Sequence, residues 1–136
     1  MKDEYLLDTS ALYPLLFKIL THEVNIDFIS SSHILDLTIY ELGNAIWKDA
    51  KLLKRIKDPL SVMRNFMIII SKMKTEKVTD YVEVMLIAME RDLTFYDSAY
   101  VYVAESKGYT LITYDSELLN KCKNAKRLED ILNKQS

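Results

Sequence analysis

Four acidic residues lie at places in the sequence where their carboxylates could work together. Asp8 follows the apolar tripeptide YLL, and Asp115 follows the apolar run TLITY. Asp97 opens the stretch DSAYVYVAESKG, and Glu41 lies near the start of TIYELGNAIWK. If these carboxylates converge within a few ångströms, they cannot all stay ionised unaided, so they either hold protons or bind a cation. At neutral pH a bound metal ion is the expected solution.

The available donor atoms indicate the kind of metal and the kind of reaction. The chain has a single cysteine, Cys122, and no pair of histidines close to the acids in sequence. An oxygen-only site of this kind favours Mg²⁺ or Mn²⁺ over zinc. Beside a phosphodiester such ions activate water and stabilise the leaving oxygen, and one or two ions can share these tasks. The acids therefore predict phosphodiester hydrolysis.

Helix capping is a plainer explanation for each acid taken alone. A carboxylate at a helix N-terminus accepts hydrogen bonds from free backbone N–H groups and complements the helix dipole, which is typically worth about 1 kcal/mol. All four acids are predicted at helix N-termini, and Glu41 fits best, because TIYE matches a capping box with Thr38 as the cap. Both explanations stay open for each acid.

The elements that must position these acids alternate between strand and helix. A short strand is predicted at residues 5–7 and a helix at 11–20, whose first turn tolerates Pro14. Asp58 followed by Pro59 is a helix start, and Gly108 suits the left-handed residue that ends a helix. The other predicted strands lie at 33–38, 77–81 and 109–115, and the other helices at 38–53, 59–73, 82–93, 96–108 and 116–122, followed by a last strand and helix around 126–134.

This alternation predicts an α/β fold. Parallel strands need long crossover connections, so residues 1–136 are expected to form a single three-layer domain with a short central parallel sheet flanked by helices. In such sheets functional groups collect at the carboxyl ends of the strands. Asp8 and Asp115 occupy two of these ends.

Composition limits the class of protein. The 136 residues, 49% of them hydrophobic, suffice for one domain with a substantial core. The start MKDEYLL lacks the features of a signal peptide, and the longest apolar run, VMLIAM, is too short to span a bilayer. We therefore expect a cytoplasmic protein with no membrane partner. The net charge of −2 counts only mildly against nucleic acid, because it does not report how charge is distributed.

Three stretches of the chain, YLLDTSAL, TIYELGNAIWK and LTFYDSAYVYVAESKGYTLITYDSELL, resemble in order and spacing the motifs of PIN-domain ribonucleases of the VapC toxin type. The resemblance runs from about residue 4 to residue 130 and is weak at 21–33 and 56–80. It implies a PIN-like fold and Mg²⁺- or Mn²⁺-dependent endoribonuclease activity on RNA. It also implies a homodimer and, for the toxin of a toxin-antitoxin pair, a cognate antitoxin whose tail covers the site.

The resemblance also implies roles for individual residues. The catalytic and metal-binding residues are the four acids, Asp8, Glu41, Asp97 and Asp115. The supporting polar residues are Thr9, Ser10, Asn44 and Thr113. On its spacing alone, Asn44 is explained equally well as a solvated residue three positions after Glu41.

A basic stretch is a candidate surface for RNA. Residues 48–57, KDAKLLKRIK, carry five basic residues and one acid. Lys48, Lys51 and Arg55 recur at helical spacing on a face that continues from Glu41, where they could guide an RNA backbone toward the acids. A solvated helix end, where cations complement the dipole, explains the same pattern.

Two other functions stay open. One is an RNA-processing PIN nuclease without an antitoxin, and the other is a catalytically inactive dimeric RNA-binding or regulatory module. Loss of one of the acids would mark the inactive module, and none is lost. An aspartyl-phosphate phosphotransferase is set aside, because such enzymes place a second aspartate two residues after the first, where this chain has Ser10.

Overall fold

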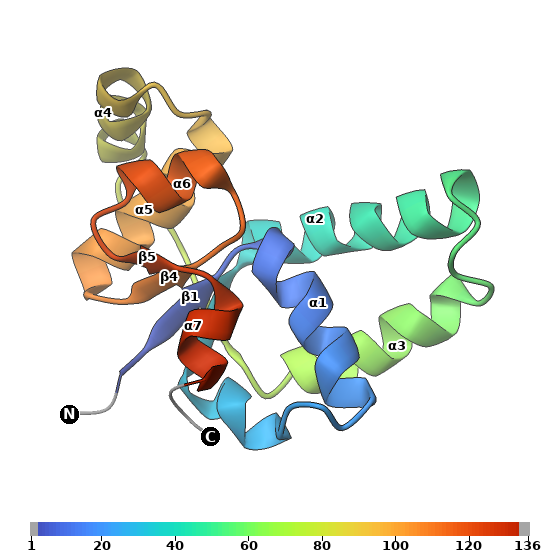
Figure 1. Cartoon of the computed structure of the whole chain (residues 1–136). Coiled ribbons are helices and arrows are strands. Elements are labelled where there is room, and N and C mark those ends of the chain that lie inside the picture. The colour runs from blue at the N-terminus through green and yellow to red at the C-terminus, as the bar shows by residue number, and fades with distance from the viewer. Residues whose placement is uncertain (1–2, 134–136) are drawn as a thin grey trace.

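The computed structural model describes residues 3–133 and arranges them as strands that alternate with helices (Figure 1). In chain order the elements are β1 (Tyr5–Leu7), α1 (Thr9–Leu20), η1 (Ile26–Ser31), β2 (Ser32–Leu35), α2 (Asp36–Trp47), η2 (Lys48–Leu52), α3 (Pro59–Ile70), β3 (Lys74–Glu76), α4 (Tyr81–Arg91), α5 (Phe95–Lys107), β4 (Thr110–Ile112), α6 (Ser116–Lys121), β5 (Ala125–Lys126) and α7 (Leu128–Leu132).

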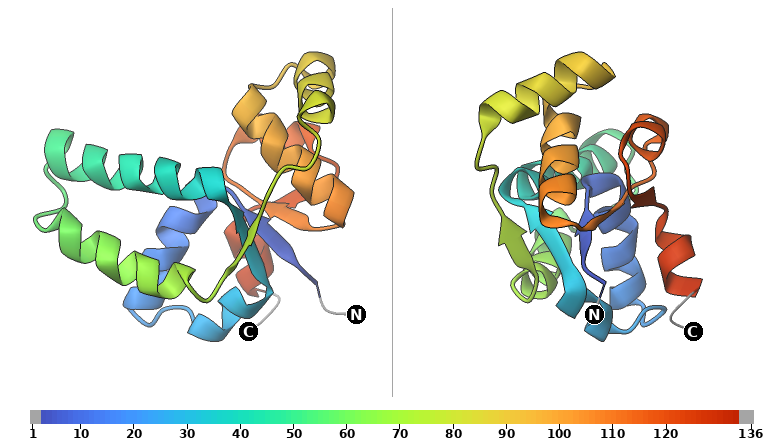
Figure 2. Two further views of the ribbon diagram at one scale, coloured as in Figure 1. Left: turned by 180° about the vertical axis from the view of Figure 1, so that it is seen from behind. Right: turned by 90° about the vertical axis from the view of Figure 1, so that its left-hand side faces the viewer.

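The five strands form one parallel sheet in the order β3-β2-β1-β4-β5. β1 lies at the centre, where Leu6 pairs with His33 of β2 on one side and with Leu111 of β4 on the other. Helices connect successive strands, as parallel pairing requires, and lie on both sides of the sheet (Figure 2). The predicted α/β domain with a parallel sheet between helical layers is confirmed.

Alternate residues of the central strands enter two separate cores. Leu7 and Ile112 pack with α1, α2, α3 and α7, whereas Leu6 and Leu111 pack with α4, α5 and α6. All four side chains are 0% exposed, and full burial of one such side chain is worth about 1.5–3 kcal/mol. Because a slip of one residue would move each side chain into the wrong core, burial fixes the register of the strands.

The third strand lies earlier than predicted. β3 is Lys74–Glu76, whereas the sequence indicated a strand within 77–81. β3 is an edge strand that pairs only with β2, and its residues are exposed or half-buried. Its sequence, KTE, therefore has no apolar run that could mark it.

Helix α1 begins two residues before the predicted start. The Asp8 side chain accepts a hydrogen bond from the Ala11 N–H (3.1 Å) and acts as the N-cap, so Thr9 is the first helical residue. Pro14 consequently lies in the second turn instead of the first. Its missing N–H costs the helix one backbone hydrogen bond, which the buried face of α1 tolerates.

Helix α2 also begins earlier than predicted, at Asp36 instead of near Thr38, and Leu35 is its N-cap. Thr38 is the third helical residue, and its hydroxyl accepts a hydrogen bond from the Leu35 N–H (3.1 Å). The interpretation of TIYE as a capping box is therefore wrong. Glu41 lies in the second turn of α2, beyond the free N–H groups of its first turn.

Beyond α2 the chain makes a π-helical turn and then reverses. In η2 the Leu53 N–H donates to the carbonyl of Lys48, five residues back (3.0 Å). Helix α3 starts as predicted, with Asp58 accepting from the Ser61 N–H (3.1 Å) and Pro59 in the first turn. We call α2, η2 and α3 together the arm, because they project side by side from the sheet (Figures 1 and 2).

The rest of the chain follows the predicted order. Helices α4, α5 and α6 correspond to the predicted 82–93, 96–108 and 116–122, and β4 is shorter than the predicted 109–115. The predicted domain ends at residues 1 and 136, and the end of the last helix at Lys134, lie outside the described residues. Within 3–133, no helix combines the length and the apolar character needed to cross a membrane.

The two glycines should respond to alanine in opposite ways. Gly108 ends α5 with φ at +75°, as predicted, and alanine adopts this conformation only with strain. Gly43 lies inside α2, where an added Cβ would meet Met63 Cε at an ordinary 3.9 Å. We expect Gly108→Ala to lower the free energy of unfolding by about 1 kcal/mol and Gly43→Ala to raise it by about the same amount. Urea denaturation measures both, and shifts of equal sign would contradict this assignment.

Candidate active site

Asp8 lies at the carboxyl end of β1, where the sheet meets α1. It is 7% exposed, and both of its carboxylate oxygens accept hydrogen bonds. Oδ1 accepts from the Ser10 hydroxyl (2.6 Å) and the Ala11 N–H (3.1 Å), while Oδ2 accepts from the Thr113 hydroxyl. Since a carboxylate oxygen has about two acceptor sites, Oδ2 keeps capacity for a further ligand.

Two hydroxyl side chains connect the ends of β1 and β4. The buried Thr113 hydroxyl donates to Asp8 and accepts from the Asp115 N–H (3.0 Å). The Ser10 hydroxyl donates to Asp8 and accepts from the Tyr114 N–H (2.9 Å). Because β1 and β4 pair in parallel, they end at the same edge of the sheet, and Asp8 and Asp115 share this hydrogen-bond network.

Glu41 comes from α2, and two hydroxyls hold one of its carboxylate oxygens. Oε1 accepts from Thr9 (3.0 Å) and from Tyr100 (2.7 Å). Thr9 directly follows Asp8, so this contact joins α2 to the end of β1. Oε2 receives no hydrogen bond from residues 3–133, which leaves it available to a ligand.

Asp97 and Asp115 lie at the starts of α5 and α6. The N-cap of α5 is Thr94, whose hydroxyl accepts from the Asp97 N–H (3.1 Å). Asp115 is itself the N-cap of α6, and its Oδ1 accepts from the N–H groups of Glu117 (2.8 Å) and Leu118 (3.1 Å). These caps hold both acids on well-defined helix ends.

Helix capping therefore explains two of the four acids. Asp8 caps α1 and Asp115 caps α6, whereas Asp97 follows a separate cap. The expectation that every acid lies at a helix N-terminus is wrong for Glu41. Its carboxylate instead accepts hydrogen bonds from the side chains of Thr9 and Tyr100. Asp97 still complements the helix dipole from the first turn of α5, whereas neither capping nor the dipole accounts for Glu41.

Burial and like charges couple the four acids. Burial raises the pKa of Asp8, although hydrogen bonds to its carboxylate act in the opposite direction, and the charge of Asp97 raises it further. Burial also raises the pKa of Asp97, as do the charges of Asp115 and Glu41. Asp97 thus lies within electrostatic reach of the other three acids, and a bound cation would relieve their repulsion.

This donor set fits a hard divalent cation. The acids supply only oxygen atoms, and their repulsion favours a positive charge between them. Within residues 3–133, no group of three or more histidine, cysteine, aspartate or glutamate side chains forms a preformed metal cage. The fit therefore depends on the chemistry of the donors and on their electrostatic coupling. The metal-binding roles of the acids stay a prediction.

The remaining predicted site residues lie along the arm. Asn44 is exposed on α2 and forms no side-chain hydrogen bond within the described part of the chain. Lys48 and Lys51 are exposed in η2, whereas Arg55 lies beyond its end and is 3.9 Å from Asp49. The prediction that Lys48, Lys51 and Arg55 share one helical face is wrong. The π-helical turn alters the spacing of residues 48–52, and the helix ends before Arg55. The RNA contacts of these residues stay a prediction.

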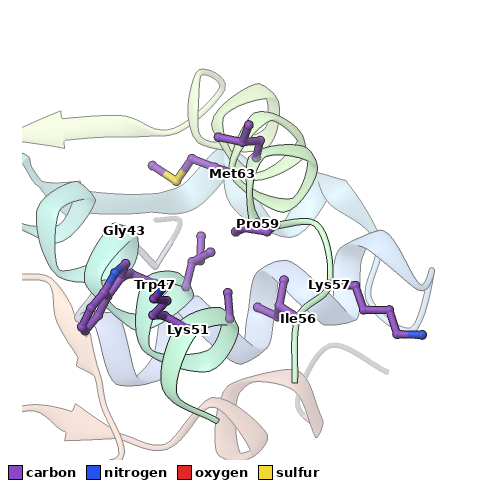
Figure 3. A pocket seen from close by; sticks show the side chains of 10 residues that line it. Gly43, Trp47, Lys51, Ile56, Lys57, Pro59 and Met63 are labelled. Atoms are coloured by element: carbon purple, nitrogen blue, oxygen red, sulfur yellow. The ribbon is translucent and has the colours of Figure 1, made fainter. Parts of the chain in front are cut away.

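A groove opens between α2 and α3 (Figure 3). Its volume is about 520 Å³, and apolar side chains such as Trp47, Ile56 and Met63 line it together with Lys51 and Lys57. None of the four acids belongs to its lining. The groove is therefore an apolar surface separate from the candidate active site.

Sequence reasoning missed two residues of the site. Tyr100, which the sequence did not single out as a site residue, is buried, and its hydroxyl donates to Glu41. Thr38, expected to be a cap, is 2.7 Å from the same hydroxyl. Spacing was the available signal, because Tyr100 follows Asp97 by three residues and Thr38 precedes Glu41 by three, each pair on one helical face.

Comparison with known proteins finds relatives over nearly the whole chain. The model of the PIN domain matches residues 5–124. The chain is 44% identical over 132 residues to exonuclease VapC9 of Pyrobaculum aerophilum, covering 97% of this chain and 96% of the relative. It is 37% identical over 93 residues to ribonuclease VapC3 of the same organism, covering 65% and 70%. The crystal structure of PAE2754 from Pyrobaculum aerophilum is similar with a TM-score of 0.86 and 43% identity, over 97% and 94% of the two chains.

The raised pKa of Asp97 predicts how stability responds to pH. A carboxyl group whose pKa is higher in the folded chain destabilises the fold once it is ionised. That loss begins as pH rises above the ordinary value of 3.8 and is complete above the raised pKa. In the absence of metal, Asp97→Asn should therefore raise the free energy of unfolding near neutral pH, by up to about 1 kcal/mol, and leave it unchanged near pH 3.

Urea denaturation in EDTA at the two pH values measures this difference. Added Mn²⁺ should stabilise the wild type more than Asp97→Asn, because the variant lacks one anionic ligand. A variant that is less stable than the wild type at neutral pH without metal would contradict the repulsion among the acids.

Proposed function

The chain belongs to the PIN-domain family, and we propose that it is a Mg²⁺- or Mn²⁺-dependent endoribonuclease that hydrolyses phosphodiester bonds of RNA. Both VapC relatives are named as nucleases, and the chain is a nuclease of this type. One observation supports the proposed chemistry above all others. At the carboxyl edge of the sheet, hydroxyl groups orient Asp8 and Glu41, and Asp97 lies within electrostatic reach of both of them and of Asp115.

The proposal gives the chain's own residues separate tasks. The four acids hold one or two ions, which supply the activation of water and the stabilisation of the leaving oxygen when bound. Ser10 and Thr113 hold the Asp8 carboxylate in one orientation through both of its oxygens. Thr9 holds one oxygen of Glu41 and leaves the other available. These orienting groups limit the reorganisation that the site needs when an ion and a phosphate arrive.

One of the two relatives is named for a mode of cleavage, exonuclease VapC9, whereas ribonuclease VapC3 is named for its substrate. We propose internal cleavage. Three of the acids, Glu41, Asp97 and Asp115, are half-buried and so reach the surface. This exposure supports an open approach to the acids, which admits an internal segment of RNA as well as an end.

We further propose the partners of the protein. RNA would be guided toward the acids by the exposed Lys48 and Lys51 of the arm. A cognate antitoxin is proposed from the VapC relationship, with the protein as the toxin of the pair.

The apolar face of α4, where Val82 is 78% and Met89 is 76% exposed, supports a homodimer. The cytoplasmic location stays a prediction.

The alternatives differ in how much support they have. An RNA-processing nuclease without an antitoxin would use the same acids, so a small antitoxin-like reading frame beside the gene distinguishes the two roles. A catalytically inactive module is less well supported, because all four acids are present and coupled.

Substitution of single acids tests the proposed chemistry. Asp97→Asn should abolish Mn²⁺-dependent cleavage of single-stranded RNA while the fold is retained, because the amide is a poor ligand for a hard ion. Glu41→Gln should have a similar effect, although glutamine still accepts hydrogen bonds from Thr9 and Tyr100. Glu83→Gln, at an exposed position of α4, is the control and should cleave normally. An acid whose variant keeps full activity does not belong to the metal site.

A circular RNA separates internal cleavage from attack at an end. We expect the wild type with Mn²⁺ to linearise a circular single-stranded RNA and to cut a linear RNA of the same sequence whose two ends are blocked. Denaturing gels reveal the products, and the Asp97→Asn variant excludes contaminating nucleases. Stepwise loss of unblocked RNA together with an intact circle would instead identify an exonuclease.

A further inference from the structure

A buried tyrosine reaches the candidate active site from α5. Tyr100 is 1% exposed, and its hydroxyl oxygen lies 2.7 Å from Oε1 of Glu41 and 2.7 Å from Oγ1 of Thr38. Oγ1 of Thr38 in turn lies 3.1 Å from the backbone nitrogen of Leu35, the last residue of β2. One continuous chain of hydrogen bonds therefore connects the sheet, α2 and α5.

The direction of this chain follows from its two ends. The Leu35 N–H can only donate, so Thr38 accepts from it and directs its own proton to Tyr100. An ionised Glu41 can only accept, so Tyr100 donates to it. Burial raises the pKa of Tyr100, the bond with Thr38 opposes this, and the charge of Glu41 raises it again, so the phenol keeps its proton. The bonds run one way, from a backbone N–H to the carboxylate.

The same tyrosine relates two of the acids in space. Asp97 and Tyr100 are three residues apart in α5 and so share one face of the helix. The bond from Tyr100 to Glu41 therefore fixes the acid of α2 relative to the acid of α5. Thr9 supplies the second bond to the same oxygen of Glu41, and no residue in 3–133 bonds to Oε2.

We propose that Tyr100 is a positioning residue that, with Thr38 behind it, holds Oε1 of Glu41 so that Oε2 is presented to the metal ion. This inference rests on the proposed function, because it takes Glu41 as a metal ligand. Tyr100 itself contacts neither the ion nor the RNA. Partners that orient a ligand in this way typically affect metal affinity by about 10-fold or more when they are removed.

Removal of a single hydroxyl group tests the inference. Tyr100→Phe keeps the ring that fills the core, and we expect it to bind Mn²⁺ alone about 10-fold more weakly in isothermal titration calorimetry. Tyr102→Phe is the matched control, because it removes a hydroxyl from the same helix that bonds to Thr79 (2.7 Å). Its Mn²⁺ affinity should equal that of the wild type. Wild-type affinity in Tyr100→Phe, or an equal loss in Tyr102→Phe, would overturn the inference.

A double-mutant cycle separates positioning from a general structural effect. If Tyr100 acts through Glu41, then Tyr100→Phe should not weaken Mn²⁺ binding further in the Glu41→Gln background, whereas independent effects would multiply. If the two losses of Mn²⁺ affinity multiply in the double variant, the inference is overturned, but the proposed metal site is not. If Glu41→Gln itself binds Mn²⁺ like the wild type, Glu41 is not a ligand, and the inference fails together with that part of the proposed function.

Thr38 provides a second test should Tyr100→Phe fail to fold, which circular dichroism would reveal. Thr38→Ser keeps the hydroxyl and should keep the wild-type Mn²⁺ affinity. Thr38→Val is nearly isosteric but cannot donate to Tyr100, so it should bind Mn²⁺ more weakly than Thr38→Ser. Equal affinity of the two variants would overturn the inference.

Discussion

The parallel pairing of β1 with β4 is the interaction on which the candidate site depends. Leu6 lies opposite Leu111, both fully buried, so the register cannot slip without exchanging the two cores. The Asp8 N–H donates to the carbonyl of Ile112 (3.2 Å) and continues this pairing one residue further. As a result, the Asp8 carboxylate and the Thr113 hydroxyl meet directly at the edge of the sheet. Hydrophobic burial thereby positions a polar group to within hydrogen-bond distance.

Hydroxyl groups compensate for the burial of charge near that edge. A buried carboxylate is costly unless it is hydrogen-bonded, and Asp8 receives bonds from Ser10, Thr113 and a backbone N–H. Among the described residues, no buried side-chain nitrogen or oxygen is left without a partner. The residual strain is electrostatic, since burial and neighbouring acids raise the pKa of both Asp8 and Asp97. Electrostatic repulsion of this kind is expected at a functional site, where groups that bind a cation lower the stability of the fold in the absence of that cation.

The two faces of the sheet contribute differently to the site. Helices α1 and α2 from one layer bring Thr9 and Glu41, whereas α5 from the other layer brings Asp97 and Tyr100. The hydrogen bond from Tyr100 to Glu41 joins these layers at the end of the strands. The lining of the groove in the arm includes none of the four acids, so the groove lies apart from the candidate active site. A substitution in the groove therefore does not alter any of the four acids directly.

Features that depend on neighbouring residues could be predicted from the amino-acid pattern alone. Alternating apolar runs predicted the parallel sheet, and the Asp58-Pro59 pair and Gly108 predicted helix ends that the structure confirms. Strand β3 was misplaced, because an exposed edge strand needs no apolar pattern. The side chains that contact Glu41 could likewise be identified only from the packing of the helices. The hydrogen bond between Glu41 and Tyr100 joins residues 59 positions apart. Spacing places Tyr100 on the helical face of Asp97, but nothing in the sequence pairs it with Glu41, because that contact arises from the packing of two helices on opposite layers of one sheet.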